Sequence, residues 1–118
     1  MHYRPRMTAR IEDLTQMRKG ILEYCVLARL RRAPAYGLEL ASTVGADRHL
    51  FGSEGTIYPL LSRLRKQGYV TTTWHESDNG PRRRYYQLTP AGTEALDAFT
   101  ATWADFRAAV DAVLEEAS

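Results

Sequence analysis

The chain has 118 residues, of which 44% are hydrophobic and 25% are charged, which are ordinary proportions for one globular domain. The single cysteine, Cys25, excludes a disulfide framework within one chain, and no apolar run approaches the roughly 18 residues of a membrane span. The net charge of +2 is unevenly distributed, because residues 1–89 carry 15 Lys/Arg and 8 Asp/Glu, whereas residues 90–118 carry one arginine and six acidic residues.

The uneven charge favours a body that meets a polyanion and a final segment with another role, although ordinary solvated surface would explain the charge equally well. Residues 1–10 are basic but lack a following apolar core, so they do not form a secretory signal, and we expect them to be disordered. A cytoplasmic protein is the expectation.

Two or three helices are predicted in the first part of the chain. Ile11 to Gln16 is expected to form a short helix, and Lys19 to Arg32 a longer, nearly continuously apolar one. The dipeptide Ala33-Pro34 ends it, since the residue before proline avoids the α region. A shorter helix is predicted from Tyr36 to Thr43.

The next helix has two faces of different character. It is predicted to begin at Ser53, a good N-cap, and to end near Gln67, before Gly68. The core-facing stripe consists of Ile57, Leu60, Leu61 and Leu64. The opposite face is short, polar and basic, and we expect it to suit a groove lined with phosphates and base edges. Its candidate DNA-binding residues are Ser53, Gly55, Thr56, Tyr58, Pro59, Ser62, Arg63 and Lys66. For Tyr58 the alternative is a partly buried aromatic under the hairpin.

A β-hairpin and a long helix complete the chain. Tyr69 to Glu76 is rich in β-branched and aromatic residues and predicts a strand, and Arg83 to Leu88 predicts the return strand after dense turn chemistry. Thr89 then caps a helix with Pro90 at its first position, which could run to Glu116.

This order of elements predicts a mainly α fold with a small β-hairpin, namely a winged helix-turn-helix followed by a long C-terminal dimerisation helix. The expected division is a winged helix-turn-helix DNA-binding domain over residues 11–89 and a dimerisation helix over residues 90–118. Consecutive arginines at the hairpin turn are placed to hold phosphates or probe a minor groove, namely Arg82, Arg83 and Arg84. The alternative is a charged sheet edge that prevents aggregation.

Three segments also occur in a familiar order: Leu27–Leu30 followed by Pro34–Leu40, then Ser53–Leu64, then Gly80–Thr89. Together they resemble the PadR-like transcriptional regulators, particularly the short members. The resemblance implies a dimeric DNA-binding regulator in a prokaryotic cytoplasm, usually a repressor, and in some members DNA is released by small aromatic compounds. It adds Tyr36 to the DNA-binding candidates. A proline about six residues into a helix would cost about 3 kcal/mol, but the family keeps one there, so we expect one helix with a local bend at Pro59.

The final helix carries an apolar stripe with spacings of 3 and 4 residues over three heptads, which predicts packing against a second chain. The expected dimer interface, and the site for a planar aromatic effector if one binds, consists of Leu96, Phe99, Trp103, Phe106, Val110 and Val113. Two alternatives remain open: the stripe covers the Lys19–Leu30 helix of its own chain, and the aromatic residues simply fill the interface. A two-fold dimer would read an inverted-repeat operator.

Enzymatic motifs are absent from the sequence. His2, His49 and His75 have no paired spacing, so no metal site is expected, and no phosphate loop or nucleophile motif predicts a cofactor or catalysis. Cys25 lies in an apolar helix and is interpreted as a core residue, with a redox switch as the alternative. The competing function for the whole chain is a winged-helix dimer that acts as a protein–protein interaction module.

Overall fold

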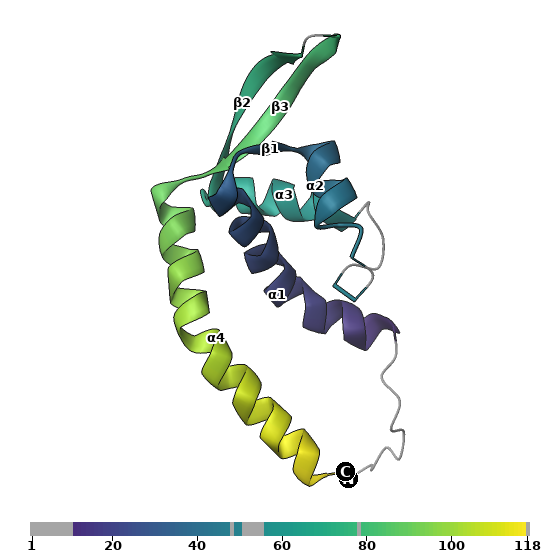
Figure 1. The fold of residues 1–118 in the computed structure, drawn as a ribbon, viewed down its shortest axis with the longest axis vertical. Helices are drawn as coiled ribbons and strands as arrows, with labels where there is room; N and C mark the ends of the chain where they lie inside the picture. Colours follow the sequence, from purple (N-terminus) through teal and green to yellow (C-terminus); the bar gives the residue numbers. More distant parts are fainter. Residues whose placement is uncertain (1–10, 48, 51–55, 78, 118) are drawn as a thin grey trace.

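The computed structural model describes residues 11–47, 49–50, 56–77 and 79–117. In chain order the elements are α1 (Ile11–Arg32), β1 (Ala35–Tyr36), α2 (Gly37–Thr43), α3 (Ile57–Lys66), β2 (Val70–Ser77), β3 (Gly80–Leu88) and α4 (Pro90–Glu116). The strands form an antiparallel sheet in the order β1-β3-β2. Figure 1 shows the β2–β3 hairpin projecting from one end of the helical body and α4 running in the opposite direction. The predicted fold class, a mainly α winged helix with a long C-terminal helix, is confirmed.

The first helix is continuous, which corrects the predicted division into Ile11–Gln16 and Lys19–Arg32. α1 runs from Ile11 to Arg32 without interruption. Gly20 lies inside it and costs only about 1 kcal/mol relative to alanine, which is too little to break a helix that packs against α3 and α4. The helix ends before Ala33-Pro34, as predicted.

One strand of the sheet was not predicted from the sequence. β1 contains only Ala35 and Tyr36, which pair with Tyr86 and Tyr85 of β3. Two residues are too short for the alternating pattern that identifies a strand in a sequence. This short strand attaches the start of α2 to the hairpin, so the hairpin is anchored in the body.

In α3 the predicted core stripe is confirmed, because Ile57, Leu60, Leu61 and Leu64 are all buried. Ser53, the predicted N-cap, and Gly55 lie outside the described residues. Pro59 is the third residue of α3. Within these bounds Pro59 lies in the first turn, whose N–H groups have no intrahelical acceptor, so the expected cost of a lost helical hydrogen bond does not apply there. The expected bend at Pro59 stays a prediction.

All helices except the distal part of α4 contribute to one hydrophobic core. Its buried members are Leu22, Val26, Leu27, Leu30, Ala35, Leu40, Ala41, Ile57, Leu60, Leu61, Leu64, Val70 and Leu96. Leu96 is 2% exposed. The prediction that Leu96 belongs to a dimer interface is wrong, because α4 begins directly behind the sheet and its second turn reaches the core of its own chain.

The hairpin root and the start of α4 are held together by backbone contacts. Gly68 has φ +80°, and the N–H of Tyr69 donates to Leu64 O at 3.0 Å, which closes α3 in a Schellman arrangement. Thr89 Oγ1 donates to Gly68 O at 2.6 Å and accepts from Gly92 N at 3.1 Å, so the predicted Thr89 cap is confirmed. A Cβ on Gly92 would lie 2.1 Å from Tyr69 O. Only glycine permits this close approach.

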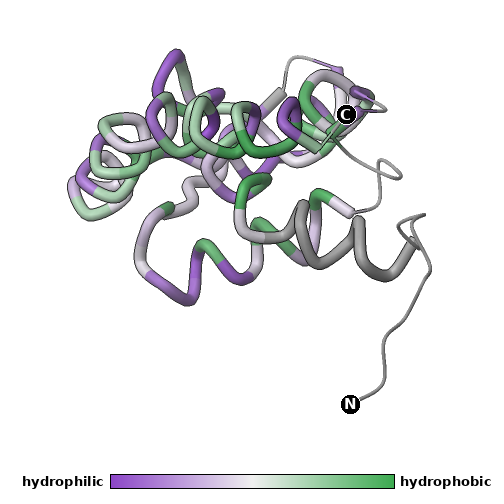
Figure 2. Tube along the Cα trace, turned by 90° about the horizontal axis from the view of Figure 1, so that it is seen from below, coloured by the Kyte–Doolittle hydropathy of each residue, from purple (hydrophilic) through white to green (hydrophobic). Residues whose placement is uncertain are grey.

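α4 extends well beyond the body. Its N-terminal part lies beside α1, whereas its C-terminal part diverges from the other helices (Figure 1). Figure 2 shows hydrophobic and hydrophilic residues alternating along this helix toward its C-terminal end. Large apolar side chains reach solvent on this part of the helix, since Phe106 and Val113 are 63% and 64% exposed.

Candidate nucleic-acid interface

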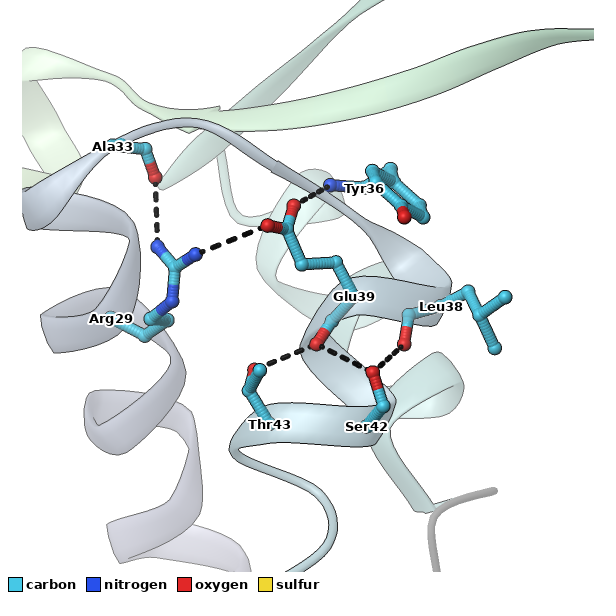
Figure 3. Close-up of polar contacts among 7 residues, drawn as sticks. All are labelled: Arg29, Ala33, Tyr36, Leu38, Glu39, Ser42 and Thr43. Carbon is cyan, nitrogen blue, oxygen red and sulfur yellow. Dashed lines mark hydrogen bonds and ion pairs between the residues drawn. The ribbon is translucent and has the colours of Figure 1, made fainter. Parts of the chain in front are cut away.

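A polar network fixes the junction where β1 becomes α2. Glu39 Oε1 accepts a hydrogen bond from the backbone N–H of Tyr36 at 3.4 Å, and Glu39 Oε2 lies 3.7 Å from Arg29 Nη2 of α1. Arg29 Nη1 also donates to Ala33 O at 3.2 Å. Figure 3 shows these contacts between α1, the junction and α2. The network holds the backbone of Tyr36 against the end of α1.

The strand register divides the hairpin side chains between two faces. Because residues alternate along a strand and direct partners share a face, Tyr36, Tyr85 and Thr73 lie on one side. His75 and its partner Arg83 lie on that side as well. We call this side the Tyr36 face. Its opposite, the Trp74 face, carries Trp74, Arg82 and Arg84 near the turn and Ala35, Val70, Tyr86 and Leu88 over the core.

Aromatic and cationic contacts run along the Tyr36 face. The Arg83 guanidinium carbon lies 4.4 Å from the centroid of the Tyr36 ring, and the Tyr36 and Tyr85 rings meet edge to face at 5.4 Å. His75 meets Tyr85 edge to face at 4.8 Å, and His75 Nε2 lies 3.0 Å from Thr73 Oγ1. Arg83 and His75 remain exposed. These side chains present hydrogen-bond donors on a surface that is already organised by ring contacts.

The other two hairpin arginines contact a different aromatic residue. The guanidinium carbons of Arg82 and Arg84 lie 5.8 Å and 5.0 Å from the Trp74 ring centroid, within cation–π range. Trp74 is 53% exposed, and Arg84 is half-buried. The three consecutive arginines that the sequence analysis grouped together are therefore divided between opposite faces of the hairpin.

Thr56, the N-cap residue of α3, is exposed, and so are Tyr58, Pro59, Ser62 and Lys66 on the helix itself. Tyr58 is 47% exposed, and its Cε1 atom would lie 3.0 Å from a Cβ on Gly37. The ring thus lies over the first residue of α2 rather than under the hairpin. Because Gly37 directly follows Tyr36, the Tyr58 contact joins the outer face of α3 to the Tyr36 face.

Arg63 is placed differently from the other α3 candidates. Its Nε lies 2.6 Å from Glu23 Oε1 of α1, and the two side chains are 39% and 18% exposed. A guanidinium held by a largely buried carboxylate offers less charge to an external anion than a free one does. Arg63 therefore connects α3 to α1.

The aromatic residues of α4 form a ladder that begins inside the chain. The rings of Tyr24 on α1 and Phe99 are stacked with centroids 4.2 Å apart, and Phe99 stacks on Trp103 at 5.4 Å. Trp103 and Phe106 follow at 6.3 Å. Arg31 also forms an ion pair with Asp97. The structure thus places Phe99 against α1, whereas Phe106, Val110 and Val113 face solvent.

Three further hairpin residues were not predicted to belong to either face of the sheet, namely Trp74, His75 and Tyr85. The alternation in residues 70–77 and 80–88 could have separated the faces. Deciding which face adjoins α2 also requires β1, because Tyr36 of β1 lies on that face.

The described residues carry little other chemistry. Among them no group of three His, Cys, Asp or Glu side chains is placed to hold a metal ion, and no helix is long and apolar enough to cross a membrane. Burial raises the pKa of the Cys25 thiol, and the nearby Asp47 carboxylate adds to this effect.

Comparison with known proteins gives a consistent family. Residues 26–98 match the model of the transcriptional regulator PadR-like family. A PadR-like transcriptional regulator from Bacillus cereus is 38% identical, with 84% of this chain and 96% of that chain covered and a TM-score of 0.73. A PadR family transcriptional regulator from Eggerthella lenta is 33% identical, with 86% and 88% covered and a TM-score of 0.71.

A PadR solved in complex with operator DNA, from Bacillus subtilis, shares the fold at lower similarity. It is 23% identical, with a TM-score of 0.60, and 68% of this chain and 47% of that chain are covered.

Proposed function

This chain belongs to the PadR-like family of transcriptional regulators, and from this premise we propose that it binds double-stranded DNA. The observation that carries the proposal is the continuous surface formed by the outer side of α3 and the Tyr36 face, joined where Tyr58 lies over Gly37. This surface combines exposed cations, hydroxyl groups and ring edges, which suit phosphate and base-edge contacts. The complex of the Bacillus subtilis relative with operator DNA supports it.

Within this surface Thr56, Ser62 and Lys66 are proposed to face the major groove, and the hairpin the adjoining backbone. Ser53 and Gly55 lie outside the described residues and are still proposed to contact DNA. Residues 11–89 are proposed as the DNA-binding domain and residues 90–118 as the dimerisation helix. The first two turns of α4 also pack against the core of the DNA-binding domain.

The proposed assembly is a homodimer formed through the distal part of α4. Phe106, Val110 and Val113 are apolar and exposed on a helix that leaves the body, and such a stripe is stable in water only when another surface covers it. A two-fold dimer presents two α3 helices, which match an inverted repeat if they lie about 34 Å apart. Binding at a promoter in the cytoplasm would then repress transcription by occupying the DNA.

A planar aromatic effector is proposed to act at the exposed end of the α4 ladder. Trp103 is half-buried, stacks on Phe99 and adjoins the exposed Phe106. A flat ligand between protomers would extend these ring contacts and shift the spacing of the two DNA-binding heads. Quenching of Trp103 fluorescence in a Trp74→Phe background by members of a panel of planar aromatics would support this. Unchanged fluorescence across the whole panel would contradict the effector proposal and would mean that the aromatic rings only fill the interface.

The test of DNA binding is retardation of the DNA upstream of the protein's own gene, compared with a mixed-sequence duplex at two salt concentrations. We expect binding that weakens by orders of magnitude between about 50 and 200 mM salt, because each neutralised phosphate contributes about −0.9 to the logarithmic slope. Absence of binding to either duplex at low salt would contradict the proposal and favour the protein-interaction module.

A further inference from the structure

We propose that Arg83, alone among the three hairpin arginines, contacts a backbone phosphate directly, and that Tyr36 is the residue that positions it. This inference rests on the proposed DNA binding and assigns the contact to one side chain. It follows from which face of the sheet each arginine occupies and from what holds each guanidinium.

The strand register determines which arginine faces the same way as α2 and α3. Tyr36 pairs with Tyr85, and Arg83 is two residues before Tyr85, so Arg83 and Tyr36 share a face. Tyr36 is followed at once by Gly37, on which Tyr58 of α3 lies. A duplex resting on the exposed side of α3 therefore meets the Tyr36 face next, and Arg83 is the cation there.

The two neighbouring arginines face the other way. Arg84 pairs with Trp74, and Arg82 lies two residues before Arg84, on the same face. That face continues toward Val70, which is 2% exposed and belongs to the core. Arg82 and Arg84 both lie within about 6 Å of the Trp74 ring. Their charges add to the long-range field, but their side chains point away from the α3 surface.

Tyr36 is suited to hold Arg83 in a binding geometry. A guanidinium that lies over a ring leaves the N–H donors at its edge available, and these donors match phosphate oxygens in pairs. The guanidinium lies 4.4 Å from the Tyr36 centroid, and the Tyr36 ring is supported on its side by Tyr85. The backbone of Tyr36 is fixed in turn by Glu39 and, through Glu39, by Arg29. The cation is thus connected to α1 through a chain of contacts, so less side-chain freedom is lost on binding.

The experiment measures the salt dependence of full-length protein binding to a fluorescently labelled mixed-sequence duplex. Arg83→Ala is expected to reduce the magnitude of the logarithmic slope by about 0.9 for each phosphate that is no longer neutralised. Arg84→Ala and Arg82→Ala remove the same charge and are the matched controls, for which we expect less than half of that reduction. An equal reduction in Arg84→Ala and Arg83→Ala would overturn the assignment of the contact to Arg83.

The role of Tyr36 has its own variants. Tyr36→Phe keeps the ring and is expected to retain the wild-type slope, whereas Tyr36→Leu is expected to reduce it as Arg83→Ala does. In the free protein, the Arg83 δ-methylene protons are expected to be shifted upfield by the Tyr36 ring current in wild type and Tyr36→Phe, and not in Tyr36→Leu. A wild-type slope in Tyr36→Leu would overturn the positioning role, even with Arg83→Ala impaired.

Failure of this inference is distinguishable from failure of the proposed function. If the wild-type protein binds with a steep slope and all three arginine variants reduce it equally, DNA binding stands and the division of the hairpin faces is wrong. If the wild-type protein shows no salt-dependent binding, both proposals are overturned. Circular dichroism of each variant confirms that a reduced slope does not reflect an unfolded protein.

Discussion

The ring of Tyr24 on α1 lies almost parallel to the ring of Phe99 on α4, with centroids 4.2 Å apart and planes 3° from parallel. Phe99 was predicted to be an interface residue, with packing on the Lys19–Leu30 helix of its own chain as the alternative, and the stack on Tyr24 supports that alternative for Phe99. The stack joins the first helix of the proposed DNA-binding domain to the helix proposed for dimerisation. A change in the position of α4 would therefore alter its packing against α1.

The energetic coupling between Tyr24 and Phe99 is measurable by a double-mutant cycle. We expect Tyr24→Leu and Phe99→Leu each to destabilise the fold, and the pair to be coupled by about 0.5–1.5 kcal/mol, the usual range for aromatic pairs. Denaturant unfolding at one fixed protomer concentration measures it, since the proposed dimerisation would make stability concentration-dependent. Additive effects of the two changes would show that the stack contributes nothing beyond area burial.

The ion pair between Arg63 and Glu23 predicts that Arg63 contributes to stability more than to DNA affinity. Arg63→Ala leaves the largely buried Glu23 carboxylate without its partner, and we expect a loss of about 1 kcal/mol. Lys66→Ala, on the exposed side of the same helix, is the control and should change stability by less than about 0.5 kcal/mol.

Salt titration of DNA binding should give the reverse order for these two variants. Lys66→Ala is expected to reduce the slope by about 0.9 per phosphate, and Arg63→Ala by less. An Arg63→Ala variant with normal stability and a strongly reduced slope would show that the Glu23 pair opens when DNA binds.

Close packing at the hairpin root predicts opposite effects for two glycine substitutions. A Cβ on Gly92 would lie 2.1 Å from Tyr69 O, whereas a Cβ on Gly20 has no heavy atom within 4 Å. Gly92→Ala must displace the start of α4 and is expected to cost at least about 1–3 kcal/mol. Gly20→Ala, in the middle of α1, is expected to stabilise by about 0.5–1 kcal/mol. Thermal unfolding of both variants checks this, and a neutral Gly92→Ala would mean that α4 moves freely at its root.

Much of this fold could be predicted because the local signals agreed with the tertiary structure. The α3 stripe and the Thr89 cap with Pro90 are found where their patterns put them. The hairpin is present as predicted, but its return strand begins at Gly80 rather than at Arg83. Pro59 was misjudged because its cost depends on where the helix begins.

The division of the candidate site could not be predicted, since it depends on contacts between distant residues. The separation of Arg83 from Arg82 and Arg84 requires the pairing of Tyr36 with Tyr85, 49 positions away in the sequence, and β1 gives no pattern of its own. Likewise, the apolar stripe of α4 does not distinguish Leu96, which enters its own core, from Val113, which remains exposed. A periodic pattern shows that a face will be covered, not which surface covers it.

Burial of Cys25 predicts a specific pH dependence. Because burial, and secondarily Asp47, raise the pKa of this thiol, the folded protein keeps the proton to higher pH than the unfolded chain does. The contribution of the neutral thiol to stability is therefore fully present below the unfolded pKa and is lost as the pH rises through the folded pKa. We expect alkylation by iodoacetamide to reach half-maximal rate at higher pH in native protein than in urea, with Cys25→Ser as the unreactive control. A native midpoint at or below that of the unfolded chain would contradict this and favour a redox role.

The exposed part of the α4 stripe predicts which residues form the proposed dimer interface. Phe106 is 63% exposed despite its size, and a two-fold interface would contain it twice, so one substitution alters two contacts. We expect Phe106→Asp to weaken dimerisation by roughly 100-fold or more, since a buried aromatic anchor contributes about 2 kcal/mol or more. Ala108→Asp adds the same charge on the opposite side of the helix, 200° from Phe106 at about 100° per residue, and should leave the dimer intact. Sedimentation over a dilution series measures both. Equal weakening by the two variants would point to charge repulsion alone, and an unaffected Phe106→Asp dimer would place the interface elsewhere on the chain.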